Sequence, residues 1–125
     1  MARDSSIKVT IAFNDPDMDA EEQEEQAQKL LNQMQELDEV EEVARVLDPN
    51  SPEGNKALGG FLVGILTAEV NPANIKNLMG FLGDRLSGKT IEMEVEANGK
   101  KLKVKASSQA ELMAAIQAAQ EFIKL

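Results

Sequence analysis

The sequence predicts an α+β fold, a two-layer sandwich in which a four-stranded sheet carries helices on one face only. Charged and apolar residues alternate on both sides of an Asn-Gly pair in residues 91–106, and residues 7–13 alternate in the same way. Apolar residues recur at helical spacing between and after these segments. The expected element order is β-α-β-α-α-β-β-α. We expect the 125 residues to form a single domain, with residues 1–6 as a disordered tail.

The hairpin over residues 91–106 follows from its turn. Asn98-Gly99 suits a type I′ turn, in which both central residues need positive φ. Counting outward from the turn places three acids opposite three lysines: Glu96 with Lys101, Glu94 with Lys103, and Glu92 with Lys105. The second face of both strands is apolar, so helices can cover only that face. We interpret the charged face as solvated, with a polar docking surface as the alternative.

The first part of the chain reads as strand, helix and strand. Residues 7–13 form the first strand, and the turn cluster 14–17 ends it. Asp19 is expected to cap a helix that runs to about Asp38, with Glu22 completing a capping box. A second strand is predicted over Val40–Asp48, where imperfect alternation allows a bulge, and a loop over 49–54 follows. The inward residues of the helix are Ala27, Leu30, Leu31, Met34 and Leu37.

A second helix is predicted over residues 55–70, which carry no charge between Ala57 and Ala68. Small residues fall on one stripe of this helix and allow another helix to approach closely, although plain packing within the domain would use them in the same way. A helix that is apolar all round should be buried all round, and a two-layer domain leaves part of it uncovered. We therefore expect a homo-oligomer or a partner contact here. The interface candidates are Gly60, Phe61, Val63, Gly64, Thr67 and Val70.

Two further helices complete the pattern. Asn71 as the cap and Pro72 at the first helical position begin the third helix, which Gly88 ends. Ser108 and Glu111 form a capping box that begins the C-terminal helix. The inward residues are Ile75, Leu78, Met79, Leu82 and Leu86 in the third helix, and Leu112, Met113, Ile116, Ala119 and Ile123 in the fourth.

Residues 83–90 match the phosphate-loop pattern G-x-x-x-x-G-K-T. That loop requires a strand before it and a helix after it, whereas here a helix precedes and a strand follows. We therefore interpret the match as a helix C-terminus in which Gly88 is the left-handed stop. No nucleotide or other cofactor is predicted.

Asp15, Asp17 and Asp19 resemble the start of a calcium loop. However, Ala20 and Gln26 stand where such a loop needs Gly and Glu. We expect acids at a helix N-terminus, where the dipole favours negative charge, and no dedicated metal site. Weak binding of a divalent ion by the loop is the alternative.

The composition argues against several classes of function. The net charge of −9 argues against binding to nucleic acid or anionic membranes, and 3% aromatic residues argue against stacking platforms. The chain contains no cysteine and no histidine, and no motif pairs a Ser or Thr with a Lys, so we predict that it is not an enzyme. Residues 57–68, the longest uncharged apolar run, are too short to span a membrane, and no signal peptide is recognised. We expect a cytoplasmic protein.

The order of these segments resembles the effector-associated constant component family of bacteria. The corresponding pieces are Leu37–Val40, the Pro/Gly-containing loop 49–54, the apolar pair over 57–86 and the acidic-then-basic hairpin over 91–104. The resemblance implies a non-catalytic adaptor or regulatory module encoded with variable effector domains, whose partner is an effector or signalling protein. A small-ligand sensor, with an apolar pocket beneath the Gly-rich helix, is the alternative function.

Overall fold

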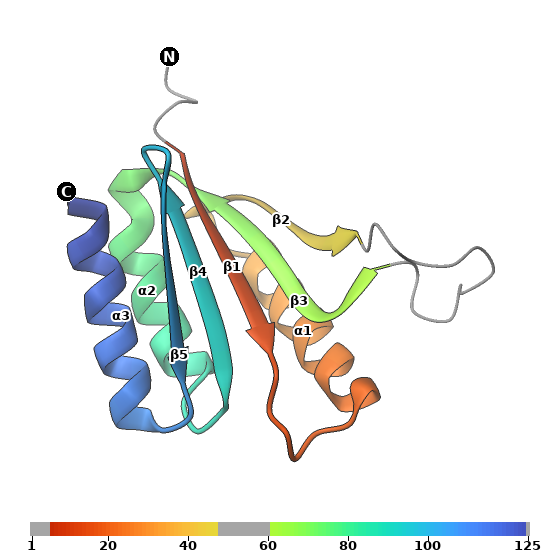
Figure 1. Cartoon of the computed structure of the whole chain (residues 1–125). Coiled ribbons are helices and arrows are strands. Elements are labelled where there is room, and N and C mark those ends of the chain that lie inside the picture. The colour runs from red at the N-terminus through yellow and green to blue at the C-terminus, as the bar shows by residue number, and fades with distance from the viewer. Residues whose placement is uncertain (1–5, 48–60, 125) are drawn as a thin grey trace.

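The computed structural model describes residues 6–47 and 61–124, which form one five-stranded antiparallel sheet and three α-helices (Figure 1). The strands are β1 (Ile7–Phe13), β2 (Val40–Leu47), β3 (Phe61–Val70), β4 (Ile91–Ala97) and β5 (Lys100–Ala106). The helices are α1 (Ala20–Gln35), α2 (Ile75–Arg85) and α3 (Gln109–Lys124), and a short 3-10 helix, η2 (Pro72–Asn74), precedes α2. The strand order is β2-β3-β1-β4-β5. The predicted α+β class is confirmed, whereas the four strands and the predicted element order are wrong.

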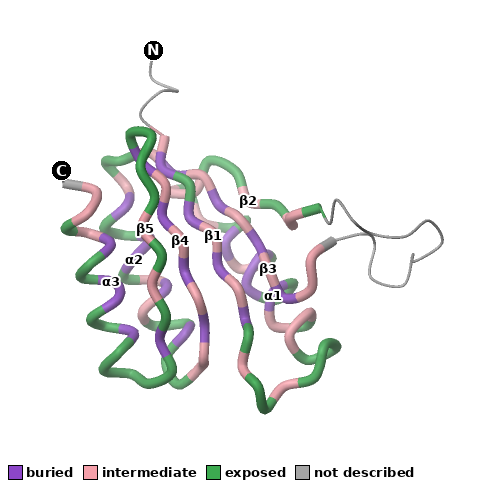
Figure 2. The backbone as a smooth tube through the Cα atoms, viewed as in Figure 1, coloured by how far each residue is buried: buried purple, intermediate pink, exposed green. Residues whose placement is uncertain are grey.

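The helices pack on one side of the sheet, and the core lies between the two layers (Figures 1 and 2). On the central strand β1, every second residue from Ile7 to Phe13 is buried, and β4 alternates in the same way from Ile91 to Ala97. Such alternation is typical of a sheet with one face on the core and one face open. The residues between them on β4 are the glutamates of the charged face.

Residues 61–70 form strand β3 and not a helix, which corrects the prediction for this segment. β3 lies inside the sheet, antiparallel to β1 from Ile7↔Val70 to Ala12↔Ile65 and to β2 on its other edge. Residues 61–66 are all apolar or glycine, although β3 has one face on the core and one open face that carries Thr67 and Glu69. A short apolar run therefore does not distinguish a buried strand from a buried helix.

The β4–β5 hairpin has the predicted register at every position. The seven pairs run from Ile91↔Ala106 to Ala97↔Lys100. Asn98 and Gly99 have φ of 55° and 77°, as the type I′ turn requires. Turn chemistry and alternation within the hairpin were sufficient to predict it.

Side-chain caps begin α1 and η2, whereas α2 begins after η2 without a side-chain cap. The Asp19 carboxylate accepts from the Glu22 N–H at 2.8 Å and the Glu22 carboxylate accepts from the Asp19 N–H at 3.2 Å, so the predicted capping box is confirmed. The Asn71 side chain accepts from the Ala73 N–H at 2.9 Å and caps η2. The predicted inward residues are buried or partly buried in the core except one. Met113 of α3 is 52% exposed, because it faces away from the sheet over α2.

Several predictions concern residues outside the described part of the chain. They are the tail over residues 1–5, the end of the second strand at residue 48, the loop 49–54 and the first part of the predicted second helix, residues 55–60. Ser6 is described, and its hydroxyl donates to the Glu41 carboxylate at 3.1 Å. None of the helices in the described residues is long and apolar enough to cross a membrane.

Candidate functional site

The predicted interface residues do not form one surface, because successive residues of a strand point to opposite faces. Val70 is fully buried between the sheet and the helices, and Gly64 is buried on the same side. Thr67 lies on the opposite face, where its hydroxyl is 2.9 Å from the Thr10 hydroxyl. Val63 is partly buried in β3, and the side chain of Phe61 lies outside the described set. The predicted helix face is therefore wrong, and a contact through these residues stays a prediction.

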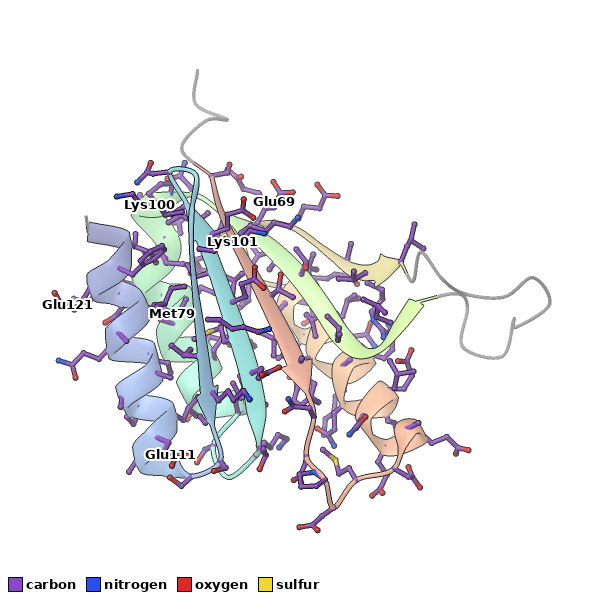
Figure 3. All side chains as sticks on the ribbon, in the orientation of Figure 1. Glu69, Met79, Lys100, Lys101, Glu111 and Glu121 are labelled. Carbon is purple, nitrogen blue, oxygen red and sulfur yellow. The ribbon has the colours of Figure 1, made fainter. Side chains whose placement is uncertain are left out.

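The uncovered side of the sheet, which we call the open face, is the first candidate surface. Figure 3, which labels Glu69 and Lys101, shows charged side chains on this side of the sheet. The open face is formed by Lys8, Thr10, Ala12, Glu42, Ala44, Ile65, Thr67, Glu69, Glu92, Glu94, Glu96, Lys101, Lys103 and Lys105.

Strand register sets the charge pattern of the open face. Lys8 of β1 lies between Glu69 of β3 and Glu96 of β4, and Glu96 is in turn opposite Lys101. Two ion pairs join the β4 and β5 rows, Lys105 Nζ to Glu92 Oε2 at 3.4 Å and Lys101 Nζ to Glu94 Oε2 at 3.7 Å. These exposed pairs contribute little stability. Their main consequence is an acidic row beside a basic row.

The middle of the open face is uncharged. The hydroxyls of Thr10 and Thr67 share one hydrogen bond, in which one hydroxyl donates and the other accepts. Next to them, Ala12 and Ile65 border a shallow depression of about 120 Å³ whose other wall includes Glu92, Glu94 and Lys103. The face therefore has a small, partly apolar centre with the charged rows of β4 and β5 beside it.

A second candidate surface is the groove between α2 and α3, which has a volume of about 530 Å³. We call it the helix groove. Phe81 forms part of its wall, and the guanidinium of Arg85 lies 5.0 Å from the centre of the Phe81 ring. The helix groove is lined by Lys76, Met79, Gly80, Phe81, Gly83 and Asp84 of α2, and by Gln109, Met113, Ile116 and Gln120 of α3.

A third feature is an ion pair that joins α1 to the β2–β3 pair. Arg45 of β2 has a side chain that is 5% exposed, and it donates to both oxygens of Glu24, at 2.5 and 2.6 Å. The same guanidinium donates to the backbone carbonyls of Leu62 and Ile65, at 3.0 and 2.9 Å. Glu24 also accepts from the Gly64 N–H at 3.1 Å. We call these contacts the Arg45 cluster.

The Arg45 cluster explains the conformation of β3. Gly64 has φ of +72°, and a Cβ there would lie 3.0 Å from the Phe13 carbonyl oxygen and 3.1 Å from Gln23 Cβ. The hydrogen bond from Arg45, followed by that from Gly64, holds the pKa of Glu24 below its ordinary value of 4.5, although partial burial acts in the opposite direction. Bidentate pairing of this kind fixes geometry as well as charge. The cluster therefore positions a bent strand and is structural.

The segment that matches the phosphate loop is a helix C-terminus, as predicted. α2 ends at Arg85, Gly88 has φ of +80°, and β4 begins at Ile91. Lys89 borders a depression of about 80 Å³ together with Lys29 and Arg85. That volume is well below the roughly 300–1,000 Å³ of ligand pockets.

The aspartates of the calcium-like segment take local structural roles. The Asp15 carboxylate accepts from the Asp17 N–H at 2.9 Å, and Asp19 caps α1. Within residues 6–47 and 61–124, no group of three or more potential ligands is placed to hold a metal ion.

Sequence reasoning identified the open face through the hairpin, and it missed the helix groove and the Arg45 cluster. An arginine at an inward position of a strand was the available signal for the cluster, since buried charges are paired. Met113 lies beside an inward stripe and could not be placed by spacing alone. Comparison with protein-family models, with curated proteins and with solved structures gives no significant match to this chain.

Proposed function

We propose that this chain is a non-catalytic adaptor or regulatory interaction module, and that it binds a protein partner through the open face. The observation that carries the proposal is the layout of that face. Its uncharged centre around Thr10, Ala12 and Ile65 is bordered on one side by the acidic row of β4 and the basic row of β5, and helices cover only the other side of the sheet. Interfaces between proteins commonly combine a less polar centre with a charged rim.

The partner class follows from the charges. Both signs are present in parallel rows, so a protein surface with its own acidic and basic groups fits better than a polyanion, which the glutamates would repel. That the partner is an effector or signalling protein of a bacterial system rests on the resemblance of the sequence to the effector-associated constant component family.

The small-ligand sensor receives less support. Its pocket was expected beneath a helix over residues 55–70, whereas residues 61–70 are strand β3. The space beside Gly64 is occupied by the Phe13 carbonyl and Gln23, and Gly60 lies outside the described residues.

Co-purification with the protein encoded beside this chain tests the proposal. Ala12→Arg should abolish the complex, because it places a long charged side chain at the centre of the open face. Ala118→Arg makes the same change on the exposed side of α3 and should leave the complex intact. Equal binding by both variants, or failure of the wild-type chain to bind that protein, would refute the assignment.

A further inference from the structure

The helix groove leaves apolar side chains uncovered. Met113 is 52% exposed at its wall, and Phe81 is only partly buried. Amide and charged side chains stand around these apolar groups, namely Lys76, Asp84, Gln109 and Gln120. An apolar surface with a polar rim is typical of an interface.

Gly80 lies at the middle of α2 on this groove, and the fold does not require a glycine there. A Cβ at Gly80 would meet no heavy atom within 4 Å, whereas a Cβ at Gly83 would lie 3.1 Å from Ile116 Cδ1. Gly83 therefore lets α3 approach α2 within the chain. Alanine is the better helix former, so Gly80 weakens α2 without relieving any contact within the described residues. It leaves a notch into which a second helix backbone could fit.

The helix groove carries one basic and one acidic residue, so the grooves of two copies of the chain can be complementary in charge. Lys76 and Asp84 lie four residues before and four residues after Gly80, a spacing that keeps all three on one face of the helix. Among the described residues no acid pairs with Lys76. The side chain of Asp84 is 81% exposed, and its Oδ2 lies 3.6 Å from Nη1 of the neighbouring Arg85.

We infer that a second copy of this chain occupies the helix groove, with the two α2 helices antiparallel and crossing at Gly80. In a two-fold arrangement, a residue before the crossing point faces the residue equally far beyond it in the other copy. Lys76 then faces Asp84 of the partner subunit, and the same pair forms again on the other side of the axis. A parallel arrangement would instead bring like charges together.

This dimer is independent of the proposed function. The helix groove is formed by α2 and α3. These helices lie on one side of the sheet, and the open face is the other side (Figure 1). A dimer built on α2 would leave both open faces accessible, so that two partner molecules could bind at once. Substitutions on one surface should not affect binding at the other.

Variants that reverse the charge at position 76 or 84 test the dimer, with sedimentation equilibrium of the full chain as the measurement. The wild-type chain should show a reversible monomer–dimer equilibrium between about 10 and 500 µM. Lys76→Glu and Asp84→Lys should each raise the dimer dissociation constant about 100-fold or more, because each creates two like-charge contacts. Lys29→Glu makes the same charge change on α1 and should leave the constant unchanged.

Mixing the two single variants provides the decisive measurement. In the mixed dimer each charge at position 76 faces the opposite charge at position 84, so the two variants should form a heterodimer with the wild-type constant. A wild-type chain that stays monomeric, single variants that dimerise normally, or a mixture that fails to associate would each overturn the proposal. Gly80→Leu should also weaken the dimer while leaving circular dichroism native, because the side chain fills only the notch.

Discussion

The sheet has two halves on either side of β1, and they are held together in different ways. In the β4–β5 half, seven pairs continue without interruption into a two-residue turn. In the β2–β3 half, the register shifts between Val40 and Glu42 and again between Arg45 and Leu47, and Gly64 adopts positive φ. The regular half is organised by its own sequence. The irregular half depends on Glu24, a residue from a different element.

This difference shows where local and tertiary interactions set strand geometry. A type I′ turn fixes the hairpin register before any helix is present. A bulged pair leaves backbone groups without ladder partners, and these must be satisfied by other means. Arg45 does so for two carbonyls of β3, and Glu24 does so for one N–H. Substitutions in the two halves should therefore lower the free energy of unfolding by different amounts.

The largest effect is expected at the Arg45 cluster. Arg45→Met leaves Glu24 without its cation and leaves the Leu62 and Ile65 carbonyls without their donor. We expect a loss of about 3 kcal/mol in the free energy of unfolding, measured by urea denaturation. The double variant Arg45→Met/Glu24→Gln should recover part of the loss, since no buried charge remains unpaired. A loss below about 1 kcal/mol would show that the cluster does not hold β3.

Two glycines with positive φ allow a matched comparison of the halves. Gly99→Ala costs only the unfavourable backbone conformation, about 1 kcal/mol, because a Cβ there meets nothing within 4 Å. Gly64→Ala adds close contacts to the Phe13 carbonyl and Gln23 Cβ, so we expect about 3 kcal/mol. Thermal and urea melts of the two variants measure the difference. Equal losses would mean that β3 can move away from α1 at little cost.

Acid should weaken the irregular half selectively. The pKa of Glu24 is lowered in the folded chain, so its ionised form stabilises the fold above the ordinary value of 4.5. That contribution is lost as the pH falls through the lower pKa of the folded state. Wild type should therefore be more stable than Glu24→Gln at neutral pH, and the two stability curves should converge as the pH falls below 4.5. Stability curves that stay parallel over this pH range would show that ionised Glu24 does not stabilise the fold.

The smallest effect is expected for the same kind of change in the hairpin. Lys105→Met removes the cation that lies 3.4 Å from Glu92, but Lys105 is 78% exposed. Water replaces the lost partner, so the free energy of unfolding should fall by about 1 kcal/mol or less. Comparison with Arg45→Met then shows how much of the difference in the free energy of unfolding is due to burial of the ion pair. A comparable loss in both variants would mean that burial is not what distinguishes the two ion pairs.

The sequence by itself determined the elements that depend on a turn, a cap or a periodic pattern of neighbouring residues. Asn98-Gly99 set the hairpin and its register, Asp19 and Glu22 set the start of α1, and Gly88 marked the end of α2. The apolar stripes of the helices also predicted nearly all of their buried residues. These features depend on turn conformation, capping and periodicity, which act over short stretches of chain.

Tertiary structure decided the rest. The apolar run 61–66 suits either a buried helix or a strand, and residues 61–70 are a strand because β1 and β2 pair with their two edges. The outward position of Met113 depends on how α3 lies against α2, and the partner of Arg45 lies 21 residues earlier in the chain. Contacts between distant segments form only when the layers pack, so patterns within either segment do not contain them.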